Sequence, residues 1–113
     1  MGAGPGGHLR TSVSRAGDSA VVRLVGELDV AAEPRLRARL RDLLEPARAT
    51  PVQHVVVDGS QLLFVDLAGL RVLLDAHRQL VARGGTLVLR APSRRVRRLL
   101  EIVDARGRLP VEP

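Results

Sequence analysis

A chain of 113 residues, 45 % of them apolar, is long enough for one domain with one hydrophobic core. It contains one Phe, no Tyr or Trp and no Cys, so the core must consist of Leu, Val and Ala, and disulfides, thiolate catalysis and Cys-based zinc sites are excluded. The net charge of +6 comes from basic residues that are all Arg, a pattern typical of a GC-rich bacterial genome.

The N-terminal residues 1–10 are rich in Gly and predict a disordered tail, followed by one domain over residues 11–113. Gly2, Gly4 and Gly7 match the pattern GxGxxG, but no strand precedes them, so we do not interpret them as a nucleotide site. No segment has the apolar length of a signal peptide or a membrane span. We therefore expect a cytoplasmic protein.

The first half of the chain predicts two strands and one helix. Residues 11–15 favour a short strand, and the β-branched residues 19–26 favour a central one. A loop then leads into a helix over residues 35–45, with Pro34 in its first turn and Pro46 at its end. Its apolar positions fall at i, i+4, i+7 and i+8. They are Leu36, Leu40, Leu43 and Leu44.

The second half begins with a buried strand over residues 52–59 and continues, after a linker, into a long helix. Asp66 stands where an N-cap would stand, and Arg83 followed by Gly84 marks the end of the helix. The predicted buried face consists of Leu70, Leu73, Leu74, His77 and Val81. The predicted exposed face consists of Arg71, Asp75, Arg78 and Gln79.

The last part of the chain predicts a strand over residues 86–90, a helix capped by Ser93 and a short edge strand within residues 109–113. Strands and helices thus alternate along the chain, and most connections are too long for hairpins. This order favours an α/β fold. We expect a mostly parallel or mixed sheet of four to five strands, covered by three to four helices.

Two aspartates are candidate site residues. Asp58 ends a predicted central strand, where a phosphoacceptor aspartate of a receiver-like protein would lie, but such a site needs a lysine that this chain lacks. We interpret Asp58 as a turn residue that accepts hydrogen bonds from nearby amides. Asp66 can cap its helix through the amides of Ala68 or Gly69, and capping alone explains it.

Other polar residues form no catalytic or metal-binding pattern. The three histidines are scattered, and His77 is interpreted as a half-buried residue with its hydrogen bonds satisfied. Glu27 and Asp29 flank Leu28 in a loop, either as contacts for a partner or as a solvated turn. The dense arginines of the last helix favour a solvated face, with an acidic partner as the alternative, and no aromatic residues or motif support nucleic-acid binding. They are Arg94, Arg95, Arg97 and Arg98.

Several segments together resemble the STAS domain of the anti-sigma factor antagonist family. They are G-E-L-D at 26–29, V-V-V-D-G-S at 55–60, D-x-x-G-L at 66–70 and L-L-E-I-V-D at 99–104. The resemblance implies a non-enzymatic bacterial protein without a cofactor, which regulates transcription by binding an anti-sigma factor, often a protein serine kinase. The implied partner-binding residues are Glu27, Asp29, Asp66, Leu67, Ala68, Gly69, Leu70 and Arg71.

The sequence departs from the family at the position that matters for regulation. Members usually carry D-S-S-G-L or D-T-S-G-L, and the kinase phosphorylates the second hydroxyl residue. Here Leu67 and Ala68 occupy the two hydroxyl positions, so no phosphate can be added at Ala68. We therefore expect an antagonist that stays in its binding-competent state.

Two alternatives remain open within the same fold. In the first, the chain is a STAS subunit of a lipid-transport ABC system. In the second, it is part of a sensory scaffold complex. The sequence leaves the oligomeric state open, with a homodimer as one alternative, and it does not name the partner.

Overall fold

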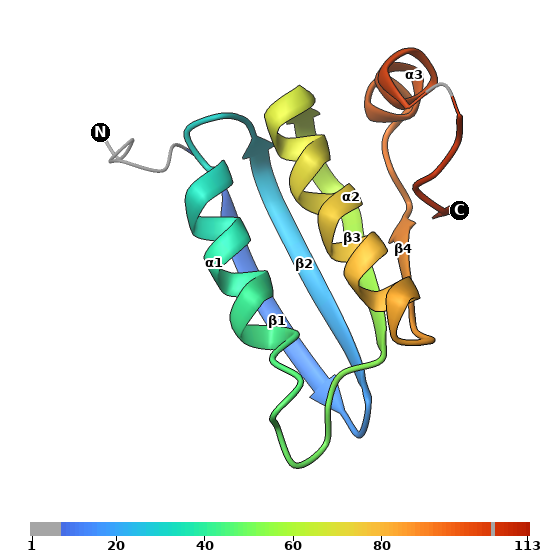
Figure 1. Ribbon diagram of the computed structural model, residues 1–113. Coiled ribbons are helices and arrows are strands. Elements are labelled where there is room, and N and C mark those ends of the chain that lie inside the picture. Colours follow the sequence, from blue (N-terminus) through green and yellow to red (C-terminus); the bar gives the residue numbers. More distant parts are fainter. Residues whose placement is uncertain (1–7, 105) are drawn as a thin grey trace.

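The computed structural model describes residues 8–104 and 106–113 (Figure 1). They form one α/β unit with a five-stranded mixed sheet and three helices, which confirms the predicted fold class. In chain order the elements are β1 (Arg10–Ala16), β2 (Ser19–Leu28), α1 (Glu33–Leu43), β3 (His54–Val65), α2 (Leu67–Ala82), β4 (Thr86–Arg90), α3 (Arg94–Val103) and β5 (Val111–Glu112).

The strands lie in the sheet in the order in which they occur in the chain, β1-β2-β3-β4-β5. The β1–β2 hairpin is antiparallel, whereas the three later pairs are parallel. Each parallel pair is joined through a helix, because a tight turn cannot return the chain to the starting edge. The start of α2 and the whole of α3 therefore lie at the carboxyl ends of the parallel strands (Figure 1).

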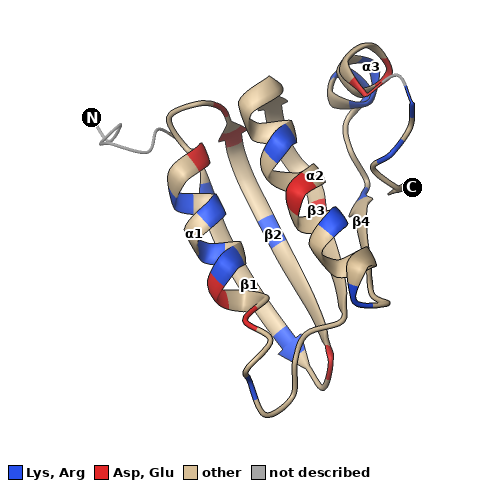
Figure 2. Ribbon diagram, viewed as in Figure 1, with Lys and Arg blue, Asp and Glu red and all other residues tan. Residues whose placement is uncertain are grey.

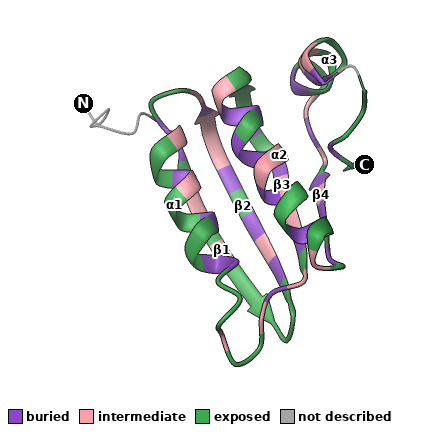
Figure 3. Cartoon of the chain, viewed as in Figure 1, coloured by how far each residue is buried: buried purple, intermediate pink, exposed green. Residues whose placement is uncertain are grey.

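The core lies between the sheet and two helices, α1 and α2, which run side by side over one face (Figures 1 and 3). Alternate residues of the central strands point into this layer, and α1 buries Leu36, Leu40 and Leu43, as the periodicity predicts. The strand residues of the core include Val22, Leu24, Val55, Val57, Leu87 and Leu89.

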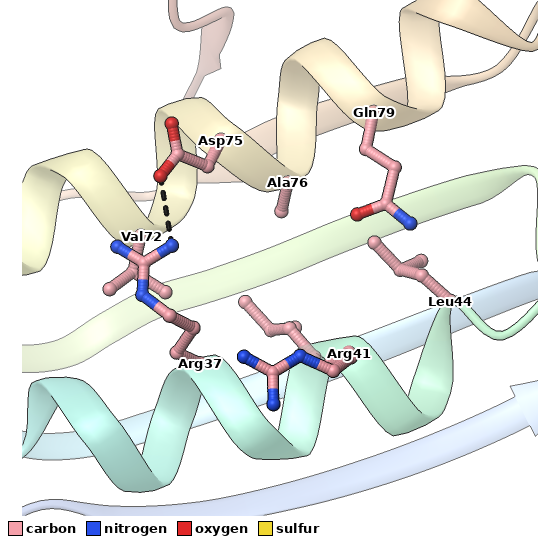
Figure 4. A pocket seen from close by; sticks show the side chains of 8 residues that line it. Arg37, Arg41, Leu44, Val72, Asp75, Ala76 and Gln79 are labelled. Carbon is pink, nitrogen blue, oxygen red and sulfur yellow. Dashed lines mark hydrogen bonds and ion pairs between the residues drawn. The ribbon is translucent and has the colours of Figure 1, made fainter.

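A polar seam joins α1 to α2 on the solvent side of this core (Figure 4). Arg37 of α1 pairs with Glu33 at 2.5 Å and, across the seam, with Asp75 of α2 at 2.9 Å. Hydrogen bonds from these two carboxylates, Glu33 first, raise the pKa of Arg37 above its ordinary value. Asp75 is therefore half-buried against α1 and is less exposed than its predicted place on the solvent face of α2 implies.

The opposite face of the sheet is half-exposed. Val21, Val56 and Val88 occupy neighbouring register positions on β2, β3 and β4. One step further along the strands, a row of alternating charge crosses the same face. It consists of Arg23, Asp58, Arg90 and Glu112.

The third strand is longer than predicted. The sequence indicated a strand ending at residue 59 and a linker up to Asp66, but β3 runs from His54 to Val65. Its pairing with β2 shifts register twice, after Asp58 and again after Leu62. These bulges interrupt the alternation of buried and exposed positions, so the extension lacks the period of a strand.

The buried face of α2 also differs from the prediction. Leu70 and Leu73 are buried as expected, but Val81 is 52 % exposed, and Leu74 and His77 are only half-buried. The positions buried in their place are Val72, Ala76 and Leu80. The reason is that α2 contacts α1 as well as the sheet, since Val72 and Ala76 face Leu40 of α1 and Leu44 directly after it. The buried face of α2 is consequently rotated toward α1.

Residues 1–7 of the predicted tail lie outside the described residues. Of the rest, Leu9 is 4 % exposed and belongs to the core, and Arg10 begins β1. The segment before β1 lies against Gly26, whose φ is +113° and whose missing side chain leaves room for the carbonyl of His8.

Candidate functional site

The start of α2 meets the loop between β2 and α1, and Asp66 connects the two. The Asp66 backbone is extended (φ −108°, ψ −176°), and its Oδ1 accepts a hydrogen bond from the Gly69 amide at 2.9 Å, as an N-cap does. Its Oδ2 accepts from the amide of Val30 at 3.1 Å. The predicted cap is therefore present, and the same carboxylate also fixes the neighbouring loop.

Asp29 shapes that loop. Its Oδ1 accepts hydrogen bonds from the amides of Ala31 and Ala32, both at 3.1 Å, and its carbonyl accepts from Ala32 and Glu33. These bonds turn the chain directly into α1, which explains why α1 begins at Glu33 rather than at the predicted Arg35. Asp29 thus has a structural role of its own in the turn.

Gly69 lets α2 approach the end of β2. An added Cβ at this position would lie 2.5 Å from Cγ of Leu28 and would also collide with the Leu28 carbonyl oxygen. The amide of Asp66 donates to that same carbonyl at 3.1 Å. Glycine is therefore needed here for close contact between backbones, and it brings the first turn of α2 beside Glu27 and Asp29.

The eight predicted partner-binding residues divide into two groups. Glu27, Asp29, Asp66 and Ala68 are half-buried, Leu67 is 49 % exposed and Arg71 is exposed, so all six reach solvent. Gly69 and Leu70 are buried. These two residues support the surface from beneath.

Sequence reasoning missed three apolar residues beside this surface. Val30 is 69 % exposed in the β2–α1 loop, and Leu63 and Phe64 of β3 are 65 % and 42 % exposed. Phe64 pairs with Glu27 across the two strands, which places it next to the predicted residues. The signal that points to Phe64 is its rarity, since it is the single aromatic residue of the chain.

The other candidate residues have structural environments. Asp58 lies within β3 rather than at its end, and its Oδ1 accepts from the Ser60 amide at 3.0 Å. Hydrogen bonds from Ser60, aided by the charges of Arg23 and Arg90, lower the pKa of Asp58. His77 is half-buried as predicted, but among the described residues its buried Nδ1 has no hydrogen-bond partner, so the expected satisfaction is absent.

No group of three or more His, Asp or Glu side chains suited to a metal ion occurs in the described ranges 8–104 and 106–113. Within these same ranges, no helix has the length and apolar character needed to cross a membrane.

Comparison with known proteins gives the same fold. The anti-sigma factor antagonist SpoIIAA in its unphosphorylated form is 24 % identical, with 94 % of this chain and 87 % of that chain covered and a TM-score of 0.69. An anti-sigma factor antagonist from Mycobacterium paratuberculosis is 22 % identical, with 98 % and 90 % covered and a TM-score of 0.80. The murine anion transporter Slc26a9 is 17 % identical, with 88 % of this chain but 17 % of that chain covered and a TM-score of 0.67.

A family model for the STAS domain matches residues 11–113. This match covers nearly the whole chain, and it agrees with the folds of the two antagonist structures and with the motifs quoted above. The chain therefore belongs to the STAS domain family.

Proposed function

We propose that the protein is an anti-sigma factor antagonist that is not switched by phosphorylation at the start of α2. Its role is to bind an anti-sigma factor of the serine-kinase type, inside a bacterial cell, and so to release a sigma factor for transcription. The protein carries out no reaction of its own in this scheme and needs no cofactor.

The observation that carries the proposal is the surface at the start of α2, on a fold shared with two anti-sigma factor antagonists. Asp66 holds the β2–α1 loop and the first turn of α2 in a fixed relation, through hydrogen bonds from the amides of Val30 and Gly69. A surface that is fixed by such hydrogen bonds is already organised for binding, so it loses little conformational entropy when a partner docks.

Ala68 accounts for the missing regulation. It is half-exposed in the first turn of α2, where a phosphate would add about −1.5 to −2 charges beside Asp29 and Asp66. Alanine has no oxygen to accept that phosphate. The apolar side chains of Leu67 and Ala68 instead offer contact area to the partner.

The test combines the purified protein with its anti-sigma factor kinase and ATP. We expect the wild-type protein to bind the kinase and to take up no phosphate, and Ala68→Ser to become phosphorylated and to dissociate. Ala82→Ser is the matched control, because Ala82 is exposed at the far end of the same helix and should stay unmodified.

Two results would contradict the proposal. Stoichiometric phosphate on the first turn of α2 in the wild-type protein would show that the switch is intact. Unchanged binding of the kinase by Leu67→Glu would show that this surface is not the docking surface, since a charged side chain at a 49 % exposed interface position must disturb a fitted contact.

The second candidate is a subunit of a membrane transport complex. Its support is the likeness in fold to the murine anion transporter, of which this chain would correspond to 17 %. Co-purification with membrane proteins that withstands salt and is unaffected by Leu67→Glu would favour this candidate over the antagonist role.

A further inference from the structure

A second surface lies between the end of β3 and α3, and Phe64 is the residue through which it adjoins the surface described above. It is a groove of about 230 Å³ whose walls are mostly apolar and whose rim is basic. Phe64 stands 42 % exposed on one side, and Ile102 stands 70 % exposed on the other. The groove residues used below are Phe64, Val96, Leu99, Ile102, Arg95 and Arg98.

The arginines of α3 have no partners in the described part of the chain. Arginines of other elements, such as Arg37, Arg78 and Arg90, pair with carboxylates at 2.8 to 2.9 Å. No ion pair or hydrogen bond of the described residues involves the guanidinium groups of Arg94, Arg95, Arg97 and Arg98. Four cations and one acid thus occupy a ten-residue helix (Figure 2).

The placement of these charges has a cost for the isolated domain. Positive side chains in the first turns of a helix oppose its dipole, which favours negative charge at that end. Repulsion among the four guanidinium groups acts in the same direction. Negative charges supplied from outside would relieve both effects.

The face of α3 beside the groove has a defined order. Arg95, Arg98 and Ile102 fall at i, i+3 and i+7, so they lie along one side of the helix, and Leu99 adjoins them. Two cations are therefore followed by an apolar stretch that continues to Phe64 across the groove. The site is concave, so it suits inserted side chains better than it suits the flat surface of a bilayer.

We propose that this groove binds an acidic amphipathic helix of a second protein, with apolar side chains inserted between Phe64 and Ile102 and carboxylates against Arg95 and Arg98. This inference goes beyond the proposed function, because it concerns α3 and Phe64 and not the start of α2, and its test uses neither an anti-sigma factor nor ATP.

The probe is a fluorescein-labelled 18-residue peptide with Leu at i, i+3, i+4 and i+7 and Glu on both flanks. Fluorescence anisotropy in 150 mM NaCl measures its affinity for the whole chain. We expect saturable binding that weakens about tenfold or more when Lys replaces Glu in the peptide, and by as much when Ser replaces Leu. Chemical-shift changes in the ¹⁵N-labelled protein should centre on Phe64, Leu99 and Ile102.

The variant Arg95→Glu/Arg98→Glu should bind the acidic peptide about tenfold or more weakly than the wild-type protein does. The matched control is Arg39→Glu/Arg41→Glu, which changes the net charge equally at two exposed arginines of α1 and should change affinity less than twofold. Ile102→Asp should lower the affinity for the peptide. Its circular dichroism spectrum should match that of the wild-type protein, because Ile102 is 70 % exposed and its replacement leaves the core intact.

Three outcomes would overturn the inference. One is the absence of saturable binding by the acidic peptide, including the case in which the protein instead sediments with vesicles of phosphatidylcholine and phosphatidylglycerol. Another is an equal loss of affinity in the α1 control, which would reduce the effect to net charge. The third is a set of chemical-shift changes that centres on Leu67 and Arg71.

Discussion

Both carboxylate oxygens of Asp66 are used, one for the amide of Gly69 and the other for the amide of Val30. The sequence predicts the first bond, because an aspartate before an apolar helix is a typical N-cap. The second bond joins residues that are 36 positions apart in the chain, and no local sequence pattern predicts it. At the scale of single residues, capping chemistry was therefore predictable, whereas the link from the helix to the β2–α1 loop was not.

Gly69→Ala should destabilise the protein even though alanine is the better helix former. Helix propensity alone predicts a gain of roughly 1 kcal/mol. The added Cβ would collide with the backbone and side chain of Leu28, and such overpacking costs about 1–3 kcal/mol. Urea unfolding measures the net change. Ala38→Gly at an exposed position of α1 reports propensity alone. A stabilised Gly69→Ala variant would show that α2 does not need this close contact.

Asp58→Asn should weaken the dependence of stability on acid. Hydrogen bonds from Ser60 lower the folded-state pKa of Asp58. The ionised carboxylate therefore contributes to the free energy of unfolding above the unfolded-state pKa of about 4, and this contribution is lost as the pH falls through the folded-state pKa. The variant should be less stable at pH 7 and should lose less stability between pH 4 and pH 2. Unfolding by urea at each pH tests this, with Asp42→Asn as a charge-matched control. Parallel curves for wild type and Asp58→Asn would refute it.

At the scale of elements, the sequence predicts the kind and order of the helices and strands but not all of their limits. The buried face of α1 follows from helical periodicity, and the start of α3 follows from its Ser93 cap. The extension of β3 to Val65 and the exposure of Val81 do not, because the first depends on bulges against β2 and the second on packing against α1. Both depend on contacts between elements, and the periodicity of one segment does not predict such contacts.

Arg83 joins three elements where α2 ends. One terminal nitrogen donates to the carbonyl of Leu44 after α1, at 2.8 Å, and the other donates to the carbonyl of Val52 before β3, at 2.5 Å. Arg83→Met should therefore destabilise the protein by about 1–3 kcal/mol, since both carbonyls lose charged donors. Arg78→Met, at a side chain that is 68 % exposed, should cost less than about 1 kcal/mol. Equal losses in thermal unfolding would show that the bridge is not structural.

At the scale of the whole molecule, stability should fall from the centre of the sheet to its edges. β2 and β3 each pair on both sides, whereas β1 pairs on one side and β5 contributes two residues. Amides of Val22, Leu24 and Val57 should exchange only through global unfolding, and those of β1 and β5 through smaller openings. Native-state hydrogen exchange measures both classes. Protection of β1 equal to that of β3 would contradict this order.

The surface at the start of α2 also belongs to the scale of the whole molecule. Its residues come from β2, the β2–α1 loop, β3 and α2, and the parallel topology brings them to one end of the sheet. Six of the residues that reach this surface were predicted from the resemblance to a family. The exposure of its apolar neighbours Val30 and Phe64 is known only from the structure. Neither lies in a quoted motif or on a periodic face.

Ala68 has a consequence for the history of the gene. The residue is half-exposed in the first turn of α2, where the oxygen of a serine or threonine would meet solvent and not the core. The genetic code separates alanine codons from those of serine and threonine by the first base alone. Under the proposed function, one replication error would return the protein to control by a kinase, while Asp66 and Gly69 keep the backbone ready for it.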